Sequence, residues 1–127
     1  MQEMRDRWRR RLIAFQAAYY LAAGLWPLVH LPSFEAVTGS KTDDWLVHMV
    51  GLLAAVIGAA LGVAVAHERQ GAAEIVVLAA GAALAFAGID FWYVLSGTIS
   101  PIYLADALVE LVLLFGLTRT HRNVLAS

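Results

Sequence analysis

The sequence predicts an all-α integral membrane protein, an antiparallel up-down four-helix bundle with both termini in the cytoplasm. Apolar residues make up 61% of the 127 residues and charged residues 15%, against roughly 45–50% and about 25% in soluble domains. The apolar residues fall into four stretches of helical length, and the basic residues cluster beside alternate connections between them. These features predict one transmembrane domain over 1–127.

The first two predicted helices, near 12–31 and 44–66, carry no charged residue apart from Asp44 at the start of the second. No Asp, Glu, Lys or Arg occurs between Leu12 and Phe34 or between Trp45 and Ala66, and each run exceeds the ~20 residues needed to cross a bilayer. Pro32 and Ser33 are expected to end the first helix. The candidate N-caps of the second helix are Thr42, Asp43 and Asp44.

The other two predicted helices, near 73–96 and 101–119, are apolar stretches interrupted by acids. Asp90 lies in the first of them, and Asp106 and Glu110 lie in the second. The polar segment 96–98 is expected to separate the two helices. Ser100 and Pro101 would then supply an N-cap and a proline in the first turn.

The distribution of basic residues predicts the orientation, because loops rich in Lys and Arg stay in the cytoplasm. Eight arginines lie in the N-terminal segment, the second connection and the C-terminal tail, while the first and third connections hold only Lys41. Both termini are therefore expected inside, and the protein is expected in a bacterial inner membrane. Net charge is −1, so no basic field indicates a nucleic-acid partner.

Polar residues recur at helical spacing, which predicts one inward polar face on each helix. These faces should meet in the outer half of the bundle as an outward-facing pocket. We expect Asp90 or Glu110 to be a protonated acid, Asp106 its ionised partner, and His48 a base or donor oriented by Asp44. The predicted catalytic residues are Asp90, Asp106, Glu110 and His48, and the predicted substrate-binding residues are His30, Asp44, Trp92, Tyr93 and Tyr103.

Three uses of this pocket compete. Closely spaced carboxylates divide into an acid and a base, as an isomerase, cyclase or hydrolase acting on a small apolar molecule or lipid requires. The same acids could carry protons or cations in an oligomeric transporter. A divalent metal held by His48 with the carboxylates would be a third use. A membrane subunit with a purely structural hydrogen-bond network is the alternative without chemistry.

Metal and cofactor binding are not predicted. The chain has no cysteine, and only His48 is well placed as a nitrogen ligand. Asp106 and Glu110 can share a proton, which needs no preformed ligand geometry, whereas a bound ion needs several ligands at about 2.0–2.2 Å. Besides the lipid bilayer, a homodimer is an open partner: Gly58 and Gly62 permit close helix approach, within the bundle or at a dimer face.

The segment from Phe34 to His48, FEAVTGSKTDDWLVH, is followed by Gly51 and Gly58. It resembles the segment joining the first two helices in small, uncharacterised four-helix bacterial membrane proteins. Asp90 and the Tyr103-Leu-Ala-Asp106-x-x-x-Glu110 element fit the same resemblance, which implies the fold but no activity. The placing of acids inside a helical bundle is also similar, in architecture alone, to membrane sterol-isomerase-like and terpene-cyclase proteins.

Overall fold

The computed structural model describes residues 2–39 and 43–125, with side chains as far as residue 120. Lys41 and Thr42, used above for orientation and capping, lie outside the described residues. The described residues form five α-helices and contain no β-strand. The helices are α1 (Gln2–Val29), α2 (Leu31–Thr38), α3 (Asp44–Ala66), α4 (Ala73–Leu95) and α5 (Tyr103–Leu125).

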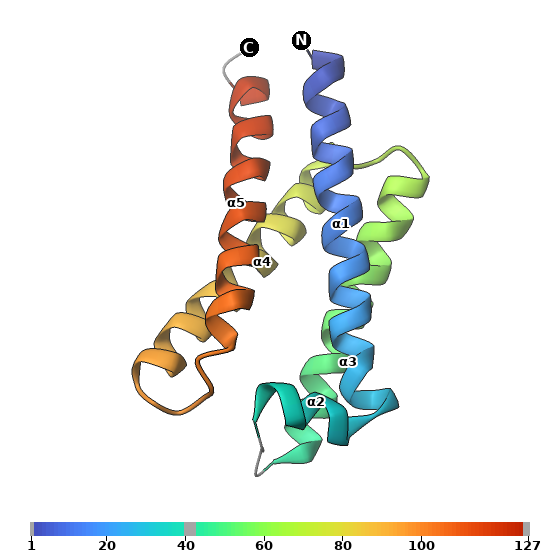
Figure 1. Ribbon diagram of the computed structural model, residues 1–127. Coiled ribbons are helices and arrows are strands. Elements are labelled where there is room, and N and C mark those ends of the chain that lie inside the picture. Colours follow the sequence, from blue (N-terminus) through green and yellow to red (C-terminus); the bar gives the residue numbers. More distant parts are fainter. Residues whose placement is uncertain (1, 40–42, 126–127) are drawn as a thin grey trace.

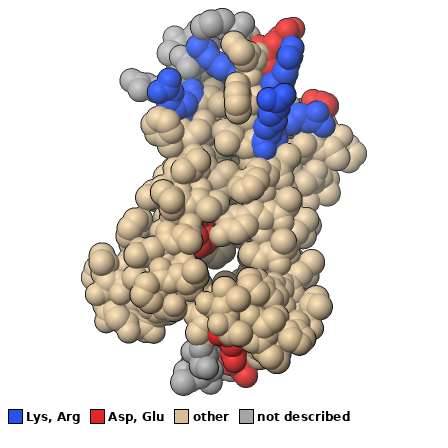
Figure 2. Space-filling view, viewed as in Figure 1, with Lys and Arg blue, Asp and Glu red and all other residues tan. Residues whose placement is uncertain are grey.

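The four long helices run alternately down and up the molecule, so α1 begins and α5 ends at the same end (Figure 1). This end, which also holds the α3–α4 connection, is called the basic end below. Arginine side chains gather there in Figure 2, whereas the middle of the molecule is almost entirely uncharged. The connection is tied to α1 by a hydrogen bond from Gln70 Nε2 to Asp6 Oδ2 (3.0 Å) and by the Arg10–Glu68 ion pair (3.6 Å).

Three helices, α1, α3 and α4, are long and apolar enough to cross a membrane. Their outward faces are apolar too: Leu53, Val63 and Val77 are all more than half exposed, as suits side chains that face lipid. The chain is therefore a multi-pass membrane protein by length and composition. The fourth span stays a prediction, because the first 18 residues of α5, 103–120, include Asp106, Glu110 and Arg119.

The first helix is longer than expected and is followed by a helix that the sequence reading missed. The arginine-rich start is helical from Gln2, since Arg, Glu and Met are good helix formers. The helix ends at Val29, and α2 begins at once. The Nδ1 atom of His30 accepts a hydrogen bond from the Ser33 backbone N–H (3.2 Å), and Pro32 occupies the first turn of α2, where no N–H is needed.

The other boundaries lie close to those predicted, except that α5 continues to Leu125, six residues beyond the predicted end at 119. Helix α3 begins after Asp43, whose side chain makes no capping hydrogen bond. Helix α4 ends at Leu95, followed by Gly97 with φ +79°, a conformation that costs glycine little. Ser100 Oγ accepts a hydrogen bond from the Ile102 N–H (3.3 Å), and the regular α5 helix starts at Tyr103.

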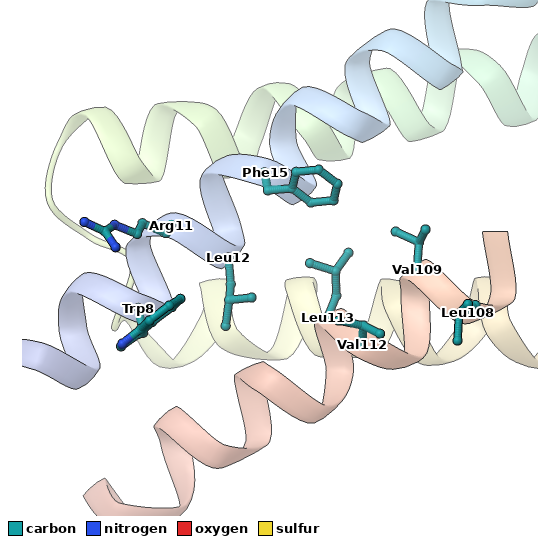
Figure 3. Close-up of a pocket in the computed structure, with 8 residues that line it drawn as sticks. All are labelled: Trp8, Arg11, Leu12, Phe15, Leu108, Val109, Val112 and Leu113. Atoms are coloured by element: carbon teal, nitrogen blue, oxygen red, sulfur yellow. The ribbon is translucent and has the colours of Figure 1, made fainter. Parts of the chain in front are cut away.

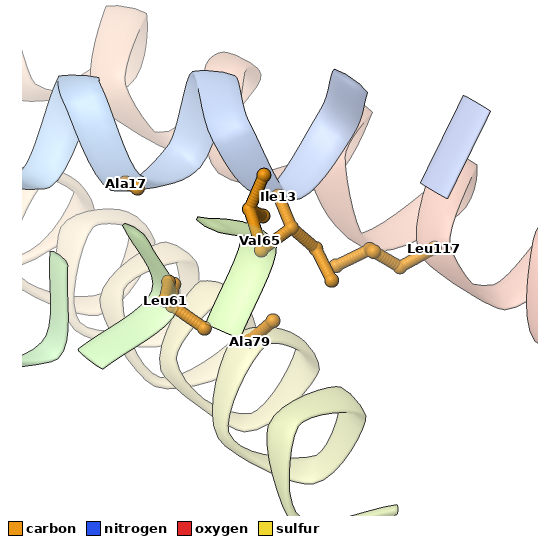
Figure 4. Close-up of a cluster of buried hydrophobic side chains, with 6 residues drawn as sticks. All are labelled: Ile13, Ala17, Leu61, Val65, Ala79 and Leu117. Carbon is orange, nitrogen blue, oxygen red and sulfur yellow. The ribbon is translucent and has the colours of Figure 1, made fainter. Parts of the chain in front are cut away.

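The core lies where the four long helices meet nearest the basic end (Figure 4). Six buried side chains form it: Ile13, Ala17, Leu61, Val65, Ala79 and Leu117. Helix α1 contributes the first two and packs most extensively against α3, while α4 packs against α5. The fold is thus two helix pairs joined along α1.

Candidate functional site

Three carboxyl groups meet between α1, α4 and α5. Asp106 and Glu110 are four residues apart and so share one face of α5. Asp90, on the adjoining face of α4, interacts electrostatically with both of them and lies within hydrogen-bonding reach of Asp106. Glu110 is fully buried and Asp90 is 5% exposed, whereas Asp106 is half-buried. The structure therefore brings together three of the four predicted catalytic residues.

Two adjacent tyrosines of α1 provide hydroxyl groups to these acids. The Tyr19 hydroxyl donates to Asp106 Oδ1. The Tyr20 hydroxyl lies 2.7 Å from Oε2 and 2.9 Å from Oε1 of Glu110. Because successive residues of a helix point about 100° apart, the pair can reach two acids that are one turn apart on α5. We call Tyr19, Tyr20, Asp90, Asp106 and Glu110 the acid–tyrosine cluster.

Gln16 and Phe86 pack beside the cluster, on the side nearer the basic end. Gln16 is fully buried, one turn before Tyr20 on α1, and its Nε2 donates to the Ala79 carbonyl of α4 (2.9 Å). The Phe86 ring meets the Tyr20 ring edge to face, with centroids 5.3 Å apart. These contacts connect α1 to α4 directly above the acids and fix the direction of the Tyr20 side chain.

Two buried oxygen atoms at the cluster have no hydrogen-bond partner among the described residues, Asp90 Oδ2 and Gln16 Oε1. Buried polar atoms in folded proteins are nearly always paired, and each exception calls for an explanation. An unpaired carboxyl oxygen in an apolar bundle marks a position where a further donor, from a ligand or a proton, would be stabilised.

The cluster also lacks a cationic partner within the described part of the chain. The ion pairs found there, Asp6–Arg9, Arg10–Glu68 and Arg69–Glu74, all lie at the basic end. No group of three or more His, Asp or Glu side chains among the described residues is arranged to hold a metal ion. The contacts that this arrangement gives the acids are the tyrosine hydroxyls of α1 and the neighbouring carboxyl groups.

The cluster lies at the middle of the uncharged part of α1. Tyr20 is nine residues from both Arg11 and Val29, which at the helical rise is about 14 Å in each direction. Below it the α4–α5 hairpin diverges from α1 and α3, and Figure 2 shows the surface hollowed there, with an acidic side chain at the upper edge of the hollow. The site is therefore deep in the bundle but open to one side.

No hydrogen bond or ion pair found among the described residues joins the acids to five other predicted site residues: His30, Asp44, His48, Trp92 and Tyr93. His48 is half-buried on α3, which packs mainly against α1. His30 is exposed and caps α2. Tyr103 is half-buried one turn before Asp106. Three further residues of the prediction are exposed: Asp44, Trp92 and Tyr93.

Sequence reasoning missed the tyrosines as site residues. Tyr20 lies on the predicted polar stripe of α1 with Gln16, four residues before it, but Tyr19 lies off that stripe. The available signal was the Tyr19-Tyr20 pair inside an otherwise apolar run, since buried tyrosines usually need a partner for the hydroxyl group. No family model, curated protein or solved structure matches this chain, so a function has to be argued from the cluster itself.

Proposed function

We propose that this chain is a bacterial inner-membrane protein that binds a small apolar molecule or lipid at the acid–tyrosine cluster and acts on it by acid/base chemistry. The observation that carries the proposal is a set of three carboxyl groups with no cationic partner among the described residues, one of which, Asp90, has a buried oxygen atom without a hydrogen-bond donor there. Isomerisation, cyclisation and hydrolysis are the reaction classes that fit.

The proposed topology has α1, α3, α4 and α5 as spans with both termini inside. The first three are apolar enough on their own. Helix α5 can join them because the tyrosine hydroxyls of α1 meet its two acids, which reduces the insertion cost of roughly 2.5–3.5 kcal/mol per unsatisfied charge. The arginines at the basic end then face the cytoplasm, as loops and tails rich in Arg do.

The chemistry follows from sharing protons among the three acids. Repulsion between carboxylates in a low-dielectric site favours states in which some are neutral and one is ionised. A neutral carboxyl group can donate a proton to a bound molecule, and an ionised neighbour can accept one from another of its atoms, so an isomerisation leaves the proton count of the site unchanged. The tyrosine hydroxyls hold the acids in position. They supply the hydrogen-bond donor that we expected from His48.

A purely structural hydrogen-bond network would be expected to pair its buried atoms. The donors that the fold supplies, Tyr19, Tyr20 and the Gln16 amide, are each directed elsewhere and leave Asp90 Oδ2 without one. A ligand with a hydroxyl or amine group would supply the missing donor. The fold also offers Asp90 the neighbouring Asp106 carboxyl, so a donor on a ligand would replace a proton shared by the two acids at this position.

The test uses infrared spectra of the protein in phosphatidylcholine vesicles, in which neutral carboxyl groups give a separate C=O band. We expect this band near neutral pH in the wild type, a smaller band in Asp90→Asn and Glu110→Gln, and no change in Asp44→Asn, which removes an exposed carboxylate of the same chain. Dodecanol, an apolar chain with one hydroxyl group, should shift the band in the wild type. In Asp90→Asn, dodecanol should not shift the smaller band that remains.

Stability measurements separate a binding site from a structural network. Both amide variants keep the shape of the side chain and remove its charge, so we expect unchanged or higher resistance to unfolding by heat in detergent. A large loss of stability in both variants, together with a band that dodecanol does not shift, would overturn the proposal in favour of a structural network.

A further inference from the structure

A groove runs along the outside of the bundle between α1 and α5, and its walls are apolar (Figure 3). It extends from Trp8 to Phe15 on α1 and from Leu108 to Leu113 on α5, and has a volume of about 360 Å³. Because both walls lie in the apolar part of the molecule, the groove opens towards lipid rather than water.

One end of the groove is positively charged. Arg11 lies over the Trp8 ring, with its guanidinium carbon 5.6 Å from the ring centroid, and both side chains belong to the groove. The ion pairs of the described residues engage Arg9, Arg10 and Arg69 but not Arg11. Arg11 therefore has no ion-pair partner among the described residues, and its charge lies at the end of the groove away from Phe15 (Figure 3).

The other end of the groove lies beside the acid–tyrosine cluster. The Phe15 ring is stacked on the Tyr19 ring, with centroids 6.0 Å apart, and Leu108 follows Asp106 by two residues on α5. From Trp8 to Phe15 the groove descends seven residues, about 10 Å along α1. A single chain of methylene groups can cover that distance from a headgroup at Arg11.

We propose that this groove binds one membrane lipid with an anionic headgroup, with the headgroup phosphate at Arg11 and one acyl chain along α1 and α5. Charge complementarity selects the headgroup, since basic sites between membrane helices on the cytoplasmic side bind anionic lipids. The contact of the end of the acyl chain with Tyr19 and Asp106 rests on the function proposed above. The binding of the lipid in the groove does not rest on that function.

Trp8 provides the readout because the other tryptophans, Trp26, Trp45 and Trp92, belong to the opposite end of the helices. In a variant carrying Trp26→Phe, Trp45→Phe and Trp92→Phe, all the tryptophan fluorescence comes from Trp8. The protein is placed in phosphatidylcholine vesicles with increasing fractions of phosphatidylglycerol brominated on its acyl chains. We expect Trp8 quenching to saturate at a low fraction of brominated phosphatidylglycerol, and brominated phosphatidylcholine to quench only in proportion to its abundance.

Two substitutions in this background test the headgroup contact and the acyl-chain groove separately. Arg11→Gln should weaken the phosphatidylglycerol dependence about fivefold, as expected for one basic residue at a membrane surface. The control Arg69→Gln removes the same charge from the same end of the molecule outside the groove and should have little effect. Val112→Phe narrows the groove without changing its charge and should reduce quenching by both brominated lipids.

Equal quenching by the two lipids, or equal effects of Arg11→Gln and Arg69→Gln, would overturn the proposal. Inorganic phosphate added up to the lipid concentration should not compete, because it lacks the acyl chain; competition by it would contradict binding along the groove. The carboxyl band of the acid–tyrosine cluster is measured in the same variants. If lipid binding fails while the carboxyl band persists, the lipid site is wrong and the proposed function stands. If the band is absent while lipid binding persists, the proposed function is wrong and the lipid site stands.

Discussion

Helix α1 has two sides that are built in opposite ways. Towards α3 it presents glycine and alanine, and the two backbones touch: a Cβ at Gly51 would lie 2.5 Å from the Gly24 carbonyl oxygen, and one at Gly58 would lie 2.8 Å from the Ala17 carbonyl oxygen. Towards α4 and α5 it presents Phe15, Tyr19 and Tyr20, whose rings hold the helices further apart. The first side has no room for a ligand, and the second has a groove and unpaired polar atoms.

The difference shows how a small membrane protein can hold acids in its interior. Close contact between small residues lets helices associate in lipid by packing alone, so the α1–α3 pair can serve as a rigid support. The tyrosines are then held at a fixed height opposite α5. Gly58, which with Gly62 was considered for a dimer contact, packs against α1 inside the bundle. Gly62 lies 3.9 Å, measured from an added Cβ, from the Ala17 Cβ.

The largest effect is expected where the backbones touch. Gly51→Leu forces a side chain into the Gly24 backbone and the Pro27 ring, and should cost about 3 kcal/mol of unfolding free energy. Titration with sodium dodecyl sulfate in mixed micelles measures the loss. Gly81→Leu is the matched control, because nothing lies within 4 Å of an added Cβ there. Equal losses in the two variants would mean that α1 and α3 are not in backbone contact.

A smaller loss is expected on the tyrosine side. Tyr20→Phe keeps the ring against Phe86 but leaves the fully buried Glu110 without its hydroxyl partner, which should cost about 2 kcal/mol. Tyr19→Phe should cost less, because Asp106 is only half-buried. Combining Tyr20→Phe with Glu110→Leu should restore part of the loss. Strict additivity in that double-mutant cycle would show that the two side chains do not interact.

At the basic end, the charged side chain of Arg9 joins α1 to α5, and we expect its loss to have a smaller effect. Arg9 is 6% exposed and its Nη2 donates to the Thr120 carbonyl oxygen (3.0 Å). Arg9→Gln should cost about 1 kcal/mol and should speed hydrogen exchange of backbone amides near Thr120, with little change around Tyr20. Uniform acceleration along α5 would instead indicate that the basic end and the cluster unfold together.

The smallest effect is expected on the outer face of α4. Gly88 has open space around an added Cβ and lies within the regular helix, so Gly88→Ala should stabilise the protein by about 0.5 kcal/mol through backbone entropy alone. The same detergent titration measures it. A clear loss of stability would reveal a contact on this face, such as a second copy of the chain, that the isolated bundle does not show.

Several features followed from the sequence alone. Apolar runs of about 20 residues predict helices such as α3 and α4 to within a residue or two, because length and hydropathy are local properties. The acids were predictable for the same reason: a carboxylate in a spanning segment has to find a partner inside the bundle. The four-residue spacing of Asp106 and Glu110 placed them on one face of α5 before any neighbour was known.

Other features depended on which helix faces meet. The glycines and alanines of α3 turn that helix towards α1, and Gly51 meets Gly24 there. His48, three residues before Gly51, therefore lies further from the basic end than Tyr20 and on a helix that packs mainly against α1. Tyr19 lies off the polar stripe of α1, yet it meets Asp106 because large side chains hold α1 and α5 apart. Periodicity along one helix determines which residues share a face, whereas side-chain volumes on two helices determine the distance and rotation at which they pack. The acids were therefore evident in the sequence, while their tyrosine partners were decided by the packing of α1.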